Sequence, residues 1–488
     1  MSTPKRTSAP ITLPFRGDRL PLVALAASML AGCAAIPTTS DRPAMRTADS
    51  FAAQKSLTAA PSNWPKDRWW EAYGDPQLTT LIDEALAGSP TLAQAEARLR
   101  AAASQEQVAR AATLPSMTGE ADASYLEQSR ESGLPPFIQN LFPKGYHSFG
   151  KLALNADYDL DLFGHNRAAL AAAVSEAEAS RADVAQARLT LSTGVAQAYG
   201  DLLRLMAERD AAAEALTNRQ QSAKLVADRL RNGLDTRAQL RQAEAAPPAS
   251  QADLEALDEQ ILLTRHRIAV LLGEGPDRGL QIVPGDNRTL KAFGLPPDVT
   301  LNLVGRRPDV TAARLRAEAA ARRIDVARAD FFPDVKLTAY VGQQALYIDQ
   351  LFNPAAAIGS IGPAVTLPIF EGGRLRGAYR EARADYDAAV ASYNQTVAQA
   401  FQDVADAAVS VQSAEKQLES RREALTAGEE AYAIAKLRYQ GGLSTYVEVL
   451  SAEDAVIGER RAYADAKSQT FLLDVALVRA LGGGFVSS

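Results

Sequence analysis

Few side chains of this protein have the setting that covalent chemistry requires. The three histidines, His147, His165 and His266, lie in unrelated stretches and lack the spacing of metal ligands. The sequence holds no Gly-x-Ser-x-Gly motif, no phosphate-binding loop and no cysteine cluster. Cys33, the single cysteine, is the one residue whose neighbours suggest a reaction. We therefore expect no enzymatic activity, no metal and no cofactor.

Cys33 follows the features of a processing signal. Basic residues come first, then the apolar run from Pro21 to Leu30, then the small residues Ala31 and Gly32. The order Leu-Ala-Gly-Cys resembles the lipobox of bacterial lipoproteins, whose cysteine becomes the diacylglyceryl-modified first residue. A buried thiol in an ordinary helix is the less favoured alternative. By the same resemblance, Ala34 in place of Asp favours delivery to the outer membrane.

The resulting domain boundaries are a signal peptide over residues 1–32 and a flexible, lipidated tether over residues 33–62, which are rich in Ala, Thr, Ser and Pro. The net charge of −6 argues against nucleic acid as a partner, because phosphate binding favours a basic face. No stretch approaches the roughly 20 apolar residues of a membrane-spanning helix.

Two very long helices dominate the remaining chain. From about Arg167 to Asn232 an apolar residue recurs at every seventh position, and the same pattern returns from about Arg374 to Gln440. A strict seven-residue repeat keeps one seam of a helix against a neighbour. At 1.5 Å per residue each helix would be roughly 100 Å long.

The sequence also repeats itself. Ala97 to Ala101 recurs as Ala313 to Ala317, and Arg229 to Thr236 corresponds to Arg438 to Thr445. These matches predict a first structural repeat over residues 63–280 and a second over residues 281–488. The pair Trp69-Trp70 near the start of the first repeat favours a packing anchor over a ligand platform.

Each repeat contains two stretches in which apolar and polar residues alternate, which predicts β-hairpins at about residues 116–162 and 334–369. The alternation fits strands of a membrane β-barrel and equally a half-buried soluble sheet. If the sheet faces lipid, its open edges must be paired, because closed barrels start at about eight strands. Copies of the chain would then pool strands to reach 8, 12 or 16.

The whole mature chain resembles the TolC-type outer-membrane factors, most closely the NodT/OprM-like outer-membrane lipoproteins of RND multidrug efflux systems. The stretches that carry the resemblance are the lipobox, Trp69 to Pro76, Tyr158 to Gly164, Arg307 to Asp309, Pro368 to Gly373 and the two Arg-x-x-x-Gly-Leu turns. The resemblance implies an α+β membrane protein and a homotrimer. It implies a 12-stranded outer-membrane β-barrel, four strands per chain, continuous with a long periplasmic α-helical barrel. The implied partners are a periplasmic adaptor, an inner-membrane RND-type pump and outer-membrane lipid.

The two helical turns are the predicted tips. Gly233 and Gly442 suit the left-handed position that ends a helix, and Asp235 and Ser444 suit the N-cap of the next one. By resemblance the tips also dock the adaptor, against the alternative that they are caps alone. The candidate docking residues are Arg229, Gly233, Leu234, Asp235, Thr236, Arg438, Gly442, Leu443, Ser444 and Thr445.

Related proteins place an aspartate just after the second turn, where this chain has Ser451. We therefore expect Glu448, Glu453 or Asp454 to supply an acidic gate, with Leu450 as an apolar constriction. A solvated helix face is the alternative. In the first returning helix, Pro247-Pro248 predicts a kink or break.

The function implied is an exit duct that carries small toxic compounds or drugs to the medium. The alternatives are the outer-membrane component of a type I protein-secretion system and a periplasmic coiled-coil scaffold without a channel.

Overall fold

The computed structural model describes residues 36–37, 43–52, 57, 63–127, 129, 144–283, 296 and 299–486. The predicted signal peptide and Cys33 lie outside the described residues. The chain forms two compact units. The first contains Val108–Ala171 and Ala321–Asp385, and the second contains Arg42–Gln107, Ala172–Ala320 and Tyr386–Ser488.

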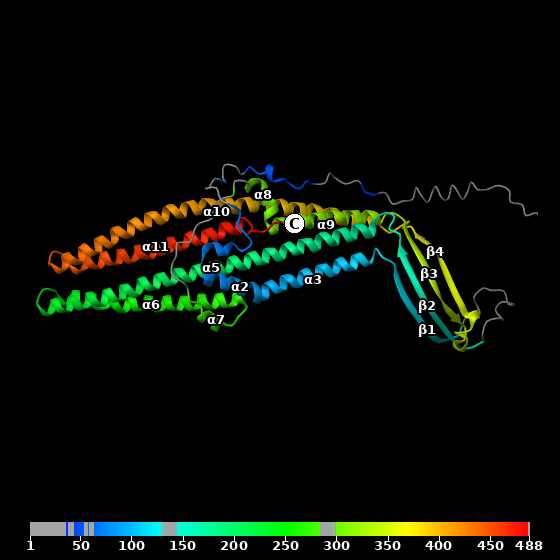
Figure 1. Cartoon of the computed structure of the whole chain (residues 1–488), viewed down its shortest axis with the longest axis horizontal. Coiled ribbons are helices and arrows are strands. Elements are labelled where there is room, and N and C mark those ends of the chain that lie inside the picture. The colour runs from blue at the N-terminus through cyan, green and yellow to red at the C-terminus, as the bar shows by residue number, and fades with distance from the viewer. Residues whose placement is uncertain are drawn as a thin grey trace, which may run out of the picture. The chain divides into compact units, whose positions relative to one another are not determined.

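The first unit is built on one antiparallel sheet of four strands, β1 (Ser116–Leu126), β2 (His147–Asp159), β3 (Asp334–Ala345) and β4 (Ala357–Thr366). The strands follow one another in the order β1-β2-β3-β4 (Figure 1). Both predicted hairpins are present. Strand β2 ends at Asp159 and β4 at Thr366, three residues before each predicted limit.

The register of the sheet places most of the large apolar residues of the four strands on one face, with Phe149 and Ile358 on the other. Leu154 of β2 lies opposite Gly119 of β1 and Val341 of β3, and Ala339 of β3 lies opposite Ile361 of β4. Cross-strand partners share a face of the sheet. This face carries Met117, Ala121, Leu152, Leu154, Ala156, Tyr158, Leu337, Ala339, Val341, Ile361 and Val365. The other face carries polar pairs such as Glu120 and Lys151, whose Oε2 and Nζ atoms are 2.7 Å apart.

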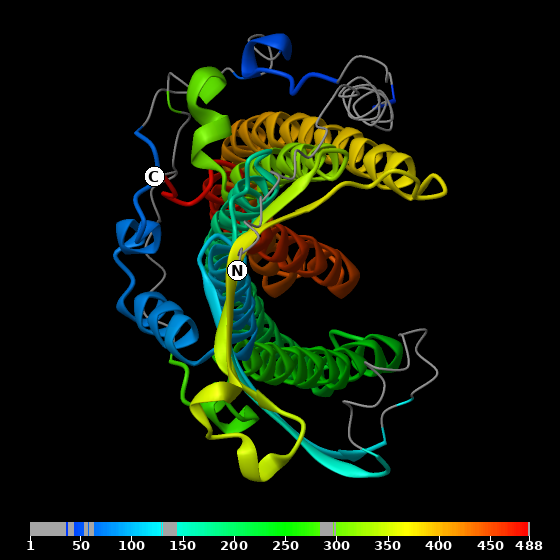
Figure 2. The ribbon, with the colours of Figure 1, turned by 90° about the vertical axis from the view of Figure 1, so that its right-hand side faces the viewer.

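Four long helices supply most of the second unit: α5 (His165–Arg231), α6 (Arg237–Leu272), α10 (Arg374–Gln440) and α11 (Tyr446–Ala480). The first turns of α5 and α10 belong to the first unit. The two rods predicted from the heptad pattern are α5 and α10, each of 67 residues. Figure 2 shows α11 (red) between α10 (orange) and α6 (green).

Shorter helices complete each repeat, with α2 (Pro76–Gly88) and α3 (Pro90–Ala111) in the first and α8 (Val299–Arg306) and α9 (Pro308–Ala329) in the second. Helices α3 and α9 have 22 residues each, as expected of duplicated elements. Helix α7 (Pro276–Leu280) lies at the end of the first predicted repeat.

The predicted break at Pro247-Pro248 is wrong, because α6 continues through both prolines. A proline removes one backbone donor and crowds the preceding turn. After the pair, the helix is held by two polar contacts with α5. Arg219 donates to Ser250 Oγ at 2.7 Å, and Arg209 pairs with Asp258 at 2.8 Å.

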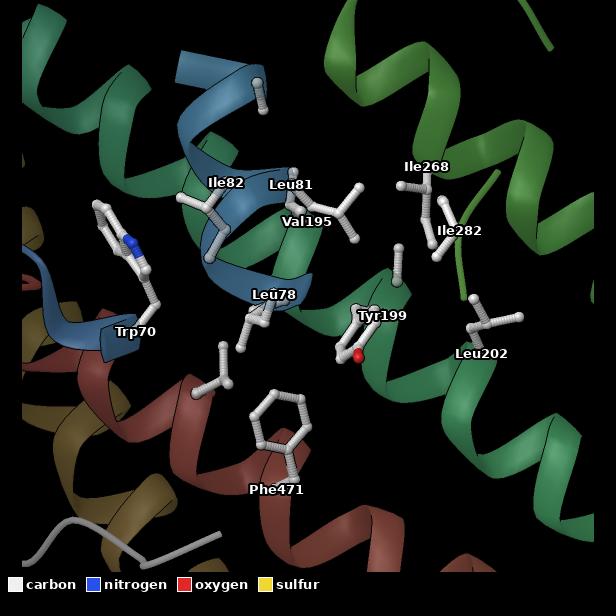
Figure 3. Packing of buried hydrophobic residues seen from close by; sticks show 14 of the residues in the cluster. Trp70, Leu78, Leu81, Ile82, Val195, Tyr199, Leu202, Ile268, Ile282 and Phe471 are labelled. Carbon is white, nitrogen blue, oxygen red and sulfur yellow. The ribbon is translucent and has the colours of Figure 1, made fainter. Parts of the chain in front are cut away.

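Trp69 and Trp70 lie in the main hydrophobic core of the second unit, at 2% and 1% exposed. They belong to a 3-10 helix, Trp69–Tyr73, which lies beside α2 and packs with residues of α5 and α11 (Figure 3). The hydroxyl of Tyr73 donates to Asp474 Oδ2 at 2.5 Å. This environment confirms the prediction of a packing anchor.

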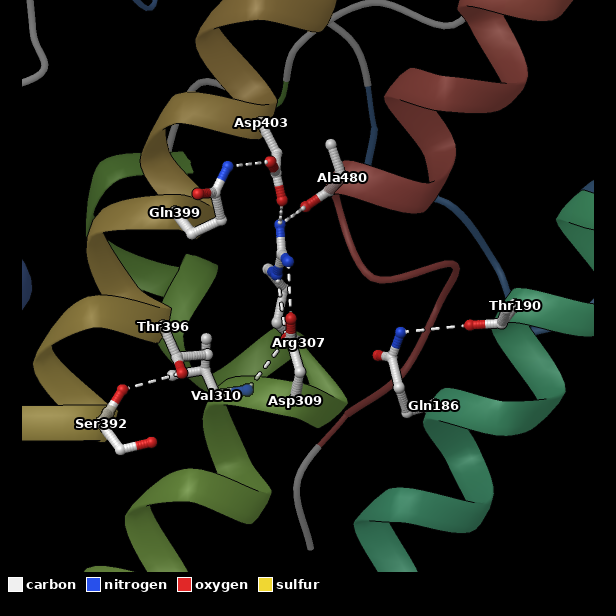
Figure 4. Close-up of polar contacts among 10 residues, drawn as sticks. All are labelled: Gln186, Thr190, Arg307, Asp309, Val310, Ser392, Thr396, Gln399, Asp403 and Ala480. Atoms are coloured by element: carbon white, nitrogen blue, oxygen red, sulfur yellow. Dashed lines mark hydrogen bonds and ion pairs between the residues drawn. The ribbon is translucent and has the colours of Figure 1, made fainter. Parts of the chain in front are cut away.

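The stretch Arg307 to Asp309 forms an ionic cluster around the buried Arg307 at the start of α9 (Figure 4). Arg307 makes two bonds to Asp309, at 3.0 and 2.6 Å, and one to Asp403 Oδ2 at 2.9 Å. It also donates to the carbonyl of Ala480 at 3.2 Å. One guanidinium therefore ties α9 to α10 and to the end of α11.

Part of the predicted flexible tether is ordered. Residues 43–52 lie on α10, where the backbone N–H of Arg46 donates to Asn394 Oδ1 at 2.8 Å. The Phe51 ring stacks on Phe401 with centroids 5.5 Å apart. The Arg46 guanidinium lies over the Phe51 ring, 4.1 Å from its centroid. The prediction of a flexible tether is therefore wrong for this segment, because Phe51 and Met45 find apolar partners that composition alone does not reveal.

Candidate functional site

The two predicted tips are tight turns of the same geometry, 209 residues apart in sequence. Gly233 and Gly442 have φ angles of 74° and 75°, in the left-handed region that glycine favours. In each turn the N–H of the following leucine bonds back to an arginine carbonyl, Leu234 to Arg229 at 2.9 Å and Leu443 to Arg438 at 2.8 Å. The prediction for the two glycines is confirmed.

The predicted N-caps are wrong by one residue. Thr236 caps α6 and Thr445 caps α11. Each threonine forms a capping box with the third residue of its helix, Gln239 and Glu448 respectively. Asp235 and Ser444 each lie one residue before the cap. Threonine is the better cap here because, with a Gln or Glu three residues later, it satisfies two backbone donors at once.

Asp235, released from capping, links the two tips. Its Oδ2 accepts from Arg229 Nε at 3.0 Å and from the hydroxyl of Tyr439 at 2.5 Å. Arg229 reaches further to the carbonyl of Tyr439 at 3.1 Å, and its guanidinium lies 4.6 Å from the centroid of the Tyr439 ring. Burial raises the pKa of the Tyr439 hydroxyl, so it stays protonated and donates. The Asp235 side chain is only 3% exposed.

Both tips present an apolar side chain to solvent. Leu234 is 63% and Leu443 is 73% exposed. Arg438 fixes the second turn by donating to the carbonyl of Leu443 at 3.4 Å. The side-chain oxygen of Ser444 is buried and has no hydrogen-bond partner among the described residues. Hydrogen bonds therefore hold the backbone of each turn, while the leucine side chain is exposed to solvent.

The candidate gate residues occupy different environments. Glu448 serves in the capping box of α11, and Leu450 is half-buried against the cluster where the four long helices meet. Asp454 reaches α5, where its Oδ1 lies 2.5 Å from Arg219. Glu453 is 1% exposed, beside Tyr432 and within the packing of the chain itself.

Several residues of this region could not be selected from sequence. Arg219 joins α5, α6 and α11 through Ser250 and Asp454. Tyr432 and Tyr439 occupy the heptad seam of α10. The heptad pattern predicts that their rings pack against a neighbouring helix, but it does not reveal that their hydroxyls contact carboxylates. The one available signal was that both tyrosines stand at positions where the seam elsewhere carries aliphatic residues.

The described side chains include no group of three or more His, Cys, Asp or Glu suited to a metal ion. None of the described helices has the length and apolar character to cross a membrane.

A sheet with an exposed apolar face, joined to long paired helices with capped tips, defines the class of outer-membrane export proteins. Residues 81–274 and 302–483 match the profile of the family described as outer membrane efflux protein. The chain belongs to this family.

Comparison with individual proteins agrees. The chain is 37% identical over 382 residues to the fusaric acid resistance protein FusA of Burkholderia cepacia, covering 76% of this chain and 70% of that one. It is 30% identical over 475 residues to the pyoverdine export outer membrane protein OpmQ of Pseudomonas putida, covering 97% and 98%. It is similar to the structure of the outer membrane protein VceC of Vibrio cholerae, with a TM-score of 0.80 and 40% identity over 86% of this chain and 100% of that one. The protein is thus an efflux protein of the outer membrane.

Proposed function

We propose that three copies of the chain assemble into an exit duct, with a β-barrel of twelve strands in the outer membrane and a helical tube in the periplasm. The duct would form the outer part of a tripartite system and release small toxic compounds to the medium. The observation that carries the proposal is the sheet, whose four strands place most of their large apolar residues on one exposed face.

The exposed apolar face supports contact with lipid. Large side chains on it are well exposed, with Met117 at 66%, Val341 at 63% and Ile361 at 74%. A contiguous apolar surface of this kind marks a contact with protein or membrane. The polar residues of the opposite face suit a water-filled interior.

The edges of the sheet support assembly from several copies. Strand β1 pairs only with β2, and β4 only with β3, within the described chain. Unpaired backbone groups are not tolerated in hydrocarbon. Three sheets of four strands joined edge to edge give twelve strands, within the range of known closed barrels.

The tips support a partner at the far end of the helices. A rigid turn with an exposed leucine offers a preorganised contact, which lowers the cost of binding. We assign Leu234 and Leu443 as the apolar contacts for a periplasmic adaptor, which would connect the duct to an inner-membrane RND-type pump. Glu448, Glu453 and Asp454 remain candidates for an acidic gate, with Leu450 as an apolar constriction.

Cys33 would carry the lipid that anchors the chain. Residues 43–52 lie on α10, so about ten residues separate the first fixed position from Cys33. Extended, such a segment spans up to about 35 Å, which allows the lipid to reach a membrane beside the chain.

The cargo class follows from the relatives, which are named for fusaric acid resistance and pyoverdine export. Small organic compounds are therefore favoured over the secreted proteins of a type I system. The test is growth of a deletion strain in a panel of antibiotics and organic acids, complemented by the wild type and by Cys33→Ala. Restored resistance with the wild type supports the duct. Unchanged resistance in the deletion strain, together with loss of a secreted protein, would favour the type I alternative.

A further inference from the structure

Glu453 is a carboxylic acid enclosed inside the helical packing near the tips. It lies on α11, and the residue is 1% exposed. Its Oε1 is 3.5 Å from the hydroxyl of Tyr432 on α10, at the outer limit of a hydrogen bond. Its Oε2 is buried without a hydrogen-bond partner in the described structure. The hydroxyl of Tyr446, two helical turns earlier on α11, is also buried and has no partner there.

The charges around Glu453 do not neutralise it. Arg219 of α5 is a nearby cation whose terminal nitrogens bond to Asp454 at 2.5 Å and to Ser250 of α6 at 2.7 Å, while its buried Nε has no hydrogen-bond partner among the described residues. Its charge lowers the pKa of the Glu453 carboxyl less than burial raises it. The charge of Lys436 on α10 acts on Glu453 less strongly than burial does. Asp454 itself repels a second negative charge.

One further ion pair joins α6 to α11 near Arg219 and Asp454. Asp253 of α6 pairs with Arg461 of α11 at 3.1 Å. Glu453 forms no ion pair of its own with any residue that the structure describes. Burial therefore raises the pKa of its carboxyl.

The enclosure is built by all four long helices. The cluster next to Glu453 contains Val226 of α5, Ala243 of α6, Tyr439 of α10, and Tyr446 and Val449 of α11. An isolated charge in such a place is costly unless water or a partner reaches it. Ionisation of Glu453 and tight packing of these helices are therefore opposed.

We propose that Glu453 makes the packing of the two helical hairpins near their tips dependent on pH, with the neutral acid holding the helices together and the carboxylate loosening them. The inference rests on the proposed function, since it assigns a regulation to the end of the duct that faces the partner. An acidic medium favours the packed tip, and a neutral or alkaline medium favours the loosened one.

The direction follows from proton linkage. An exposed glutamate titrates near pH 4.3, and the packed state holds its proton to a higher pH. Between these two values the packed state binds more protons than the loosened state, so its stability falls as the pH rises. One proton per chain changes the equilibrium by at most about tenfold per pH unit. Below this window the stabilisation is complete, and above it the loss is complete.

The test is hydrogen exchange of the backbone amides from Tyr446 to Glu453, measured by mass spectrometry between pH 5 and pH 8 on the full-length protein. The rate for the wild type is divided by the rate for Glu453→Gln at each pH, which cancels the intrinsic pH dependence of exchange. We expect this ratio to rise by up to about tenfold per pH unit within the window and then to level off.

Glu430→Gln is the matched control, because Glu430 is an exposed acid on α10. Its ratio to the wild type should stay constant with pH. Tyr432→Phe removes a donor to the carboxylate and should move the upper end of the window to higher pH. A wild-type to Glu453→Gln ratio that does not change with pH would overturn the proposal.

The exchange measurement requires neither cargo nor current. A constant ratio would therefore contradict the proton dependence and leave the duct unaffected. A protein that shows the expected ratio but carries no current across a bilayer would contradict the duct instead.

Discussion

Replacing Asp235 by alanine should open the first tip while leaving its fold otherwise intact. The carboxylate accepts from Arg229 and from Tyr439, and its side chain is 3% exposed. Its loss leaves a guanidinium and a phenol hydroxyl without their acceptor, in a place that solvent barely reaches.

The magnitude can be worked from these contacts. A hydrogen bond to a charged group contributes about 1.5–3 kcal/mol. Arg229 retains its bond to the Tyr439 carbonyl, and its side chain is 15% exposed, so the lower limit applies to each of the two bonds. The sum is about 3 kcal/mol, which is roughly a hundredfold increase in the local opening constant.

The assay is hydrogen exchange of the amides of the turn from Arg229 to Thr236. The internal repeat supplies the control, since Ser444 stands at the equivalent position of the second tip and its hydroxyl has no partner in the described chain. Ser444→Ala should change exchange of its own turn less than threefold. Equal effects of the two substitutions, or no effect of Asp235→Ala, would refute the role assigned to the carboxylate.

Three further predictions concern the sheet, the ionic cluster and the ordered segment before the first repeat. Val341→Arg on the apolar face should destabilise the assembled barrel by about 2–4 kcal/mol if the position lies near the membrane centre, and should reduce the yield of the membrane-assembled, heat-modifiable form. Ser360→Arg on the polar face should leave that yield unchanged, and equal yields of the two variants would contradict the assignment of the faces. Arg307→Met should destabilise the helical unit by about 3 kcal/mol, because two carboxylates lose their cation, and an unchanged temperature of irreversible unfolding would contradict this. Phe51→Ala removes the ring stack on α10 and should increase the rate of tryptic cleavage after Arg46 about tenfold. An unchanged cleavage rate would show that the stack does not hold residues 43–52 in place.

The long helices could be predicted because their signal is local and repeated many times. The seven-residue pattern gives α10 the same limits in the sequence and in the structure, Arg374 and Gln440. The left-handed glycines of the tips were equally clear, since few other residues adopt that conformation. The alternation of apolar and polar residues predicted the two hairpins. The register of the sheet then shows that the alternating apolar positions of the four strands lie on the same face.

Other features depend on contacts between distant parts of the chain. Asp235 and Thr236 are both good capping residues, and the choice of Thr236 leaves Asp235 to meet Tyr439, which lies 204 residues away in sequence. The segment at residues 43–52 has the composition of a flexible tether and is held by Phe401. The burial of Glu453 arises from packing between helices that the sequence places far apart. Local patterns carry no information on such pairings.

The central claim is that copies of this chain enclose a continuous aqueous path across the outer membrane. The most direct measurement is the conductance of the purified full-length protein in a planar lipid bilayer, with the mass of the same preparation determined by native mass spectrometry. We predict discrete and uniform conductance steps from a species of three chains. A three-chain species that inserts but never conducts, under acidic or alkaline conditions, would contradict the account.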